Sequence, residues 1–95
     1  MGLREDGEKI VQLLEELGTN TYDIAVKLRD LKVRGRRRSS SSCPIAVYLW
    51  SKGFLVRVGS RSLYALDGSV IHSTPPQICD LIVEFDLGRW PTLEA

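Results

Sequence analysis

The side chains with the clearest potential for chemistry are basic and lie close together in the sequence. Between positions 27 and 38 only Asp30 opposes seven basic residues, so this window carries a charge of +6 while the rest of the chain carries −5. The seven are Lys27, Arg29, Lys32, Arg34, Arg36, Arg37 and Arg38. A guanidinium group binds two phosphate oxygens at once, and a dense basic stretch is the electrostatic footprint of a nucleic-acid contact. The window predicts a site for an acidic partner, with nucleic acid as the first candidate.

Residues 34–42 contain no apolar side chain, so they predict a flexible basic loop whose guanidinium groups stay free of the protein's own carboxylates. Serine hydroxyls and the Gly35 N–H could add donors, and Arg57 and Arg61 of a following hairpin could join the contact. Such binding would be mainly to phosphates, with little choice of sequence. The alternative is a solvated linker without a binding role, because charge runs are often just that and the whole chain has a net charge of only +1.

Cys43 is the one candidate nucleophile. It precedes Pro44 at the start of an expected helix and follows three arginines, and both features favour a thiolate. A catalytic cysteine also needs a base, and nothing in the sequence brings His72, the only histidine, near it. We therefore expect Cys43 to cap the helix, and we expect no enzyme. One histidine and two distant cysteines do not make a zinc site, and no phosphate-loop or dinucleotide motif is present, so no metal or cofactor is expected.

The elements that must position these side chains predict one α+β domain over residues 1–95. Apolar spacing predicts helices over 5–17, 22–32 and 44–52, three strands of an antiparallel meander over 54–58, 62–66 and 69–72, and a last helix from 75 to Gly88. Asn20 or Thr21 caps the second helix, whose apolar stripe includes Leu31. Asp67-Gly68 predicts a type I′ hairpin turn, and Thr74 with Gln77 a capping box.

This order is loosely like that of a winged helix, with three helices before a hairpin. A base-reading role for helix 44–52 is not expected, because only Tyr48, Ser51 and Lys52 could reach base edges. The joint before it also spans about ten residues instead of the short turn of a helix-turn-helix.

A protein–protein adaptor, such as a phage protein acting on a host factor, is the rival interpretation. Trp90 could anchor a protein partner, because tryptophan is enriched at binding hot spots, although a tail packed back on the core is the preferred role. Exposed Leu55, Leu66 or Ile71 on the outer face of the sheet would indicate a partner surface or a dimer.

Two segments carry a resemblance to a known group of proteins. The helix start Cys43-Pro44-Ile45-Ala46-Val47-Tyr48-Leu49 and the ending Phe85-Asp86-Leu87-Gly88-Arg89-Trp90-Pro91 resemble a family of small actinobacterial and actinophage proteins, over about residues 21–93. The resemblance implies an intracellular bacterial or phage context and assigns no enzyme class and no functional residue. The polar N-terminus and the absence of a long apolar run agree with a cytoplasmic protein that has no membrane partner.

Overall fold

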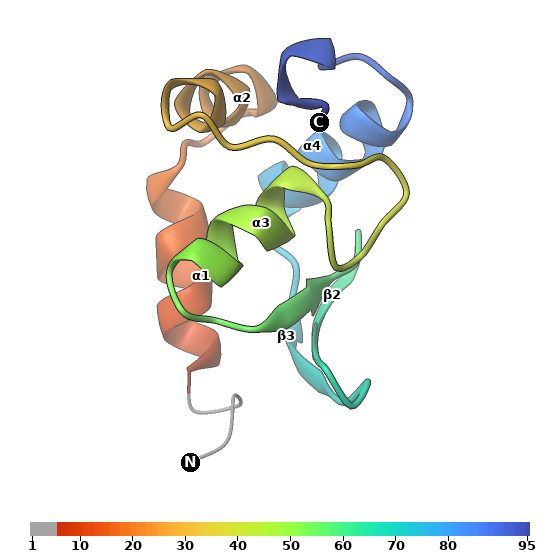
Figure 1. Cartoon of the computed structure of the whole chain (residues 1–95). Coiled ribbons are helices and arrows are strands. Elements are labelled where there is room, and N and C mark those ends of the chain that lie inside the picture. The colour runs from red at the N-terminus through yellow and green to blue at the C-terminus, as the bar shows by residue number, and fades with distance from the viewer. Residues whose placement is uncertain (1–5) are drawn as a thin grey trace.

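The structure is a computed structural model that describes residues 6–95, and it confirms the α+β class. Two helices come first, a third follows a long connection, a three-stranded meander comes next, and a fourth helix leads to a short 3₁₀ turn (Figure 1). The elements are α1 (Gly7–Glu16), α2 (Thr21–Asp30), α3 (Pro44–Ser51), β1 (Val56–Val58), β2 (Ser62–Ala65), β3 (Val70–Ser73), α4 (Pro76–Asp86) and η1 (Pro91–Leu93). Every predicted element is present, with its ends shifted by a few residues.

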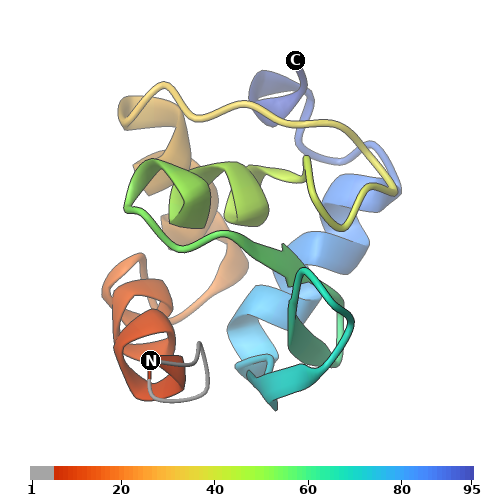
Figure 2. The same cartoon turned by 60° about the horizontal axis from the view of Figure 1, so that its bottom comes forward.

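The molecule has two ends joined by a common core. The strands pair antiparallel in the order β1-β2-β3 and lie with α1 at one end, while α2 and η1 lie at the other (Figure 2). The helices α3 and α4 lie between them. Fully buried side chains come from nearly every element, among them Ile10, Leu28, Leu49, Leu63 and Phe85. This single core makes the residues after α2 and after α4 neighbours, although they are about sixty positions apart in the sequence.

The helix α2 begins as predicted and ends earlier. Asn20 caps it, since the Asp23 N–H donates to Asn20 Oδ1 at 2.9 Å. At the other end the Lys32 N–H donates to the Arg29 carbonyl and the Val33 N–H to the Leu28 carbonyl, both at 2.9 Å, with Lys32 at φ 60°. These bonds form a Schellman motif with lysine in the place usually taken by glycine. The placement of Leu31 in the buried stripe was wrong, because the helix has ended there and Leu31 is 47% exposed.

The β2–β3 turn differs from the type I′ turn that Asp67-Gly68 predicts. Gly68 has φ +92° and Asp67 has no positive φ, whereas a type I′ turn needs both. The Ala65 N–H donates to the Ser69 carbonyl at 2.8 Å, which closes a three-residue loop with glycine in the left-handed position. Asp67 Oδ1 accepts hydrogen bonds from the Ser69 N–H and hydroxyl, and these bonds hold the aspartate in its turn.

The predicted capping box at Thr74 is wrong. The helix α4 begins at Pro76, one residue later than expected, so Pro75 takes the cap position and no side chain caps the helix. Thr74 is buried, and its hydroxyl donates to the Gly59 carbonyl at 2.8 Å. Thr74 therefore ties the start of α4 to the turn between β1 and β2.

This difference gives the first prediction. Thr74→Val should lower the free energy of unfolding by about 1 kcal/mol, because it removes a hydrogen bond and leaves a carbonyl short of a partner. Gln77→Ala should change it by less than about 0.5 kcal/mol, as is usual away from specific structural features. Urea unfolding followed by circular dichroism measures both. Equal losses for the two variants would show that the capping box forms after all.

Candidate functional site

The backbone of the basic segment, residues 34–42, is attached to the C-terminal end of the chain. The Gly35 N–H donates to the Leu93 carbonyl and the Ala95 N–H donates to the Gly35 carbonyl, both at 2.8 Å, so Gly35 forms a parallel bridge with Glu94. Gly35 is buried between Val33 and Cys43, which are buried as well. The expectation that Gly35 offers its N–H to a ligand is therefore wrong, because that N–H is already bonded.

Further along, the basic segment folds back on itself and contacts two other elements. The Arg36 N–H donates to the Ser42 carbonyl at 2.7 Å, and the Cys43 N–H to the Ser39 carbonyl at 2.9 Å. The Arg38 N–H donates to Asp86 Oδ1 of α4 at 2.8 Å.

A second contact reaches the sheet, where the Val58 N–H of β1 donates to the Ser40 carbonyl at 2.8 Å. Residues 34–42 were predicted to form a loop without contacts to the rest of the fold. This prediction is wrong for their backbone, which is hydrogen-bonded to several other elements. Its mobility in solution stays a prediction.

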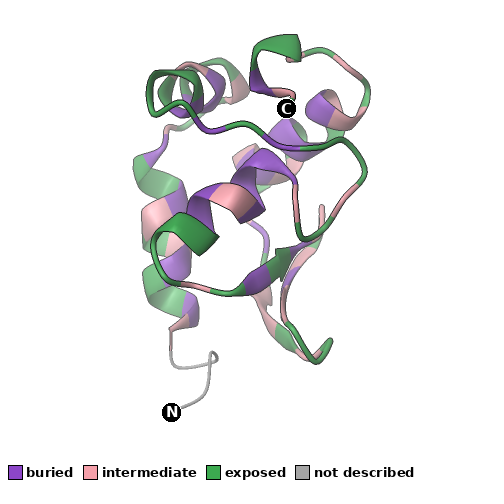
Figure 3. Cartoon of the chain, in the orientation of Figure 1, coloured by how far each residue is buried: buried purple, intermediate pink, exposed green. Residues whose placement is uncertain are grey.

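The basic side chains of the segment are exposed, whereas its backbone is bonded to other parts of the fold. All nine basic residues named from the sequence are exposed, including Arg57 and Arg61 on the hairpin. Residues 34–42, called the basic ridge below, run past the end of the molecule that carries α2 and η1, and most of them are exposed (Figure 3). The bond between Val58 and Ser40 brings the hairpin against this ridge, so Arg57 and Arg61 come from an element that contacts it. Lys27 and Arg29 lie in the last turns of α2, which leads into it.

Two of these guanidinium groups have acidic partners within the protein. Arg37 Nε lies 2.9 Å from Glu94 Oε1, and Arg29 pairs with Asp30 at 3.4 Å. The expectation that the guanidinium groups of residues 34–42 stay unpaired is therefore wrong for Arg37. In residues 6–95, the other seven form no ion pair: Lys27, Lys32, Arg34, Arg36, Arg38, Arg57 and Arg61. The C-terminal pair at Arg37 adds a second link between the ridge and the tail, and the free cations remain available to anions.

A pocket of about 220 Å³ lies where the ridge meets the hairpin. Arg38, Ser39, Ser40 and Ser60 supply polar groups to it, but the Asp86 carboxylate lines it too. A carboxylate repels a phosphate oxygen, so this pocket does not suit an anion. The cations that remain open to an anion are the exposed arginines outside this pocket.

Cys43 is a structural cap, as expected. Its sulfur accepts a hydrogen bond from the Ala46 N–H at 3.4 Å, and the side chain is only 3% exposed. Burial raises the pKa of the Cys43 thiol, so the features that favoured a thiolate in the sequence are overcome by desolvation. His72 lies on the edge strand β3, and its Nδ1 is 2.9 Å from the Ser73 carbonyl oxygen. The two residues form no catalytic pair in the described contacts.

Trp90 packs back on the core and is half-buried, as the preferred interpretation holds. Its Nε1 donates to Glu84 Oε1 at 3.2 Å. Its ring centroid lies 6.4 Å from that of Tyr22, whose side chain is 66% exposed. Tyr22 was not among the predicted site residues, because the proximity of positions 22 and 90 arises only in the folded chain.

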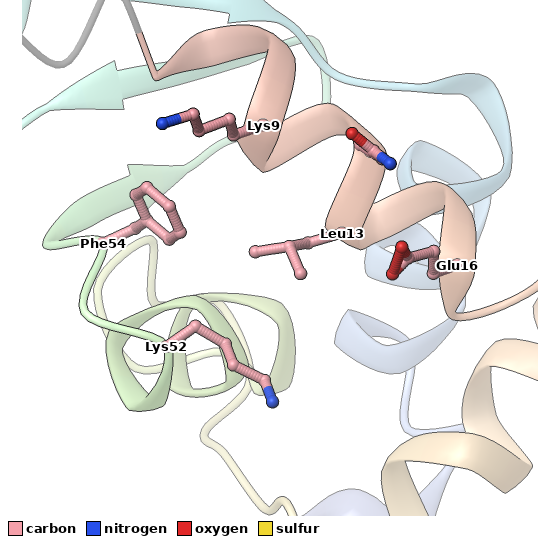
Figure 4. A pocket seen from close by; sticks show the side chains of 6 residues that line it. Lys9, Leu13, Glu16, Lys52 and Phe54 are labelled. Carbon is pink, nitrogen blue, oxygen red and sulfur yellow. The ribbon is translucent and has the colours of Figure 1, made fainter.

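Another pocket, of about 420 Å³, lies between α1 and the segment after α3 (Figure 4). Leu13 and Phe54 form its apolar wall, and Lys9, Glu16 and Lys52 surround it. The ammonium groups of the two lysines point away from each other, so they do not converge on one ligand. The pocket therefore lacks the convergent polar groups of a typical small-molecule site.

Other kinds of site find little support in the described part of the chain. No group of three or more histidine, cysteine, aspartate or glutamate side chains in residues 6–95 could hold a metal ion. None of the described helices is long and apolar enough to cross a bilayer. Comparison with known proteins adds no identification, since no protein-family model, curated protein or solved structure matches this chain.

The close packing around Gly35 gives the second prediction. A Cβ at this position would lie 2.4 Å from the Ser42 carbonyl oxygen and 2.5 Å from the Pro44 nitrogen. Gly35→Ala should therefore cost at least about 2 kcal/mol of stability, since the backbone must move to relieve the overlap. At Gly53 a Cβ would meet nothing within 4 Å, and Gly53→Ala should cost only about 1 kcal/mol for its left-handed φ of +92°. Urea unfolding compares the two, and a Gly53 variant that is as unstable as the Gly35 variant would contradict the close packing.

The raised pKa of the Cys43 thiol gives a third prediction, on its reactivity. In a Cys79→Ser background, iodoacetamide should alkylate Cys43 more slowly at pH 8 than it alkylates an unfolded peptide thiol. A raised pKa lowers the thiolate fraction at that pH, and burial hinders access. Mass spectrometry follows the rate. A rate equal to or above that of the peptide would contradict a structural role.

Proposed function

We propose that this protein is a small non-enzymatic binding or regulatory module that contacts an acidic partner, nucleic acid first, through residues 27–38, which comprise the end of α2 and the arginines of the basic ridge. The main support for this proposal is that exposed basic side chains belong to a segment whose backbone is hydrogen-bonded to α4, β1 and the C-terminal tail. Holding the backbone lowers the entropy lost when the side chains engage a ligand. Solubility alone does not require such an attachment.

The charge layout supports phosphate contact as the mode of binding. The ridge concentrates the positive charge of a chain whose remaining part is acidic, so an anionic polymer would be drawn to this end of the molecule. The helix α3 supports no base-reading role, since Pro44, Ile45, Tyr48 and Leu49 are buried in the core. Contact through arginines on a ridge favours binding to the backbone with little sequence preference.

We propose a cytoplasmic location and a bacterial or phage origin. Both cysteines are free, which agrees with a reducing compartment. The resemblance of the segments at 43–49 and 85–91 to actinobacterial and actinophage proteins is the second support.

A protein–protein adaptor is the second candidate, favoured by one observation on the sheet. Leu55, Leu66 and Val70 are 45–52% exposed on or beside the hairpin strands, and such a group could cover a partner or a second copy of the chain. Trp90 and Ile71 support this candidate less, because both are half-buried against the core. Leu66→Asp should abolish self-association in analytical ultracentrifugation if the sheet face makes a dimer, and a chain that is monomeric at high concentration would reject that form.

The fourth prediction tests the ridge with variants of equal charge change. Arg36→Ala with Arg38→Ala should weaken binding to nucleic acid and reduce the slope of log K against log salt by about 2, since each phosphate contact contributes close to one unit. Lys9→Ala with Lys52→Ala removes the same two charges from the pocket beside α1 and should leave the slope unchanged.

Fluorescence anisotropy with a labelled oligonucleotide at several salt concentrations measures both slopes. Equal effects of the two double variants would show that net charge alone matters and would reject the ridge. Absence of binding by the unaltered protein at low salt would reject nucleic acid as the partner.

A further inference from the structure

A groove of about 190 Å³ lies between α2 and η1, next to the basic ridge. Tyr22, Val26 and Arg29 follow one another along one face of α2 and form one side of it. Trp90, Pro91 and Thr92 form the other side. The groove thus combines two aromatic rings, aliphatic surface and a guanidinium group.

The two rings differ in how firmly they are held. Trp90 packs on the core and its Nε1 donates to Glu84, so the indole is fixed in orientation. Tyr22 is 66% exposed and makes an interplanar angle of 56° with the indole at 6.4 Å between centroids. Rings at this angle and distance are not stacked on each other, which leaves the exposed face of Tyr22 available to a flat ligand.

The groove and the ridge are parts of one surface. The last residue of η1 and the residue after it bond to the ridge, because the Leu93 carbonyl accepts from the Gly35 N–H and Glu94 pairs with Arg37. Arg29 lines the groove itself, and its pair with Asp30 at 3.4 Å is exposed to solvent and therefore weak. A chain of phosphates that follows the arginines would bring its bases toward Tyr22 and Trp90.

We propose that this groove receives an unstacked base, so that the ligand of the ridge is single-stranded nucleic acid in preference to duplex; this inference rests on the proposed function. Aromatic side chains beside a cationic track are the usual means of holding single strands, since every base has a face that stacks on a ring. In a duplex the bases are stacked on one another, and only the phosphates reach the protein. An uncharged apolar peptide would leave the cationic border of the groove without a counterpart.

The test compares one exposed ring with matched controls. Fluorescence anisotropy is measured with a short oligo(dT) strand and with a blunt duplex of equal length, for the unaltered protein and for Tyr22→Ala, Tyr22→Phe and Val83→Ala. Tyr22→Ala should weaken binding to the single strand about tenfold, the size of one lost base stack, and leave duplex binding unchanged. Tyr22→Phe keeps a ring, and Val83→Ala removes an exposed apolar side chain from α4 outside the groove, so both should bind like the unaltered protein.

The outcomes separate this inference from the proposed function. If the Arg36 and Arg38 variant loses affinity while Tyr22→Ala does not, or if Tyr22→Ala weakens strand and duplex alike, base stacking is overturned and the ridge stands. If the unaltered protein binds neither nucleic acid, the proposed function falls and the inference falls with it.

A second readout reports on Trp90 directly. In a Trp50→Phe background Trp90 is the only tryptophan, and oligo(dT) should quench its fluorescence, since a base would enter the groove beside the indole. Binding without quenching would overturn the placement of the base.

Discussion

The pair of hydrogen bonds that joins Gly35 to Leu93 and Ala95 is the interaction on which the rest of the functional surface depends. It places a glycine where a Cβ would overlap the backbone of Ser42, Cys43 and Pro44, so the chain can cross here only because the residue has no side chain. The connection from α2 to α3 is thereby attached to the last residues of the chain. Without these bonds, the arginines on either side of Gly35 would not be held in a fixed position relative to η1 and the groove beside α2.

The attachment uses backbone groups and leaves the charged side chains outside. Val33 and Cys43 are buried at the two ends of the connection, while the arginines between them face solvent. Burying a guanidinium group would cost several kcal/mol, whereas peptide groups can be satisfied by one another at little net cost. The ion pair between Arg37 and Glu94 is likewise only partly buried. It holds the C-terminal tail and leaves the charges of Arg36 and Arg38 unpaired.

The fold class and the order of the elements could be predicted because their signals are local. Helical periodicity, the cap at Asn20 and the glycines after α1 and α4 are each decided within a few residues. Leu31 and the turn at Asp67-Gly68 were decided by local bonds, but two other failures share a different cause, since each depended on a partner far away in the sequence. Thr74 bonds to Gly59 instead of capping α4, and Gly35 bonds to Leu93 instead of lending flexibility. The basic residues could be identified from the sequence. The hydrogen bonds of their backbone and the contact between Tyr22 and Trp90 could not, because both join positions that are far apart in the chain.

Backbone hydrogen bonds hold the basic ridge in place before any ligand arrives. Native-state hydrogen exchange by NMR measures this for each amide. The amides of Gly35, Arg38 and Val58 should exchange far more slowly than those of an unstructured chain, because each donates to a partner in another part of the fold. Exchange of the Gly35 and Arg38 amides at the rate of an unstructured peptide would show instead that the segment is a free loop.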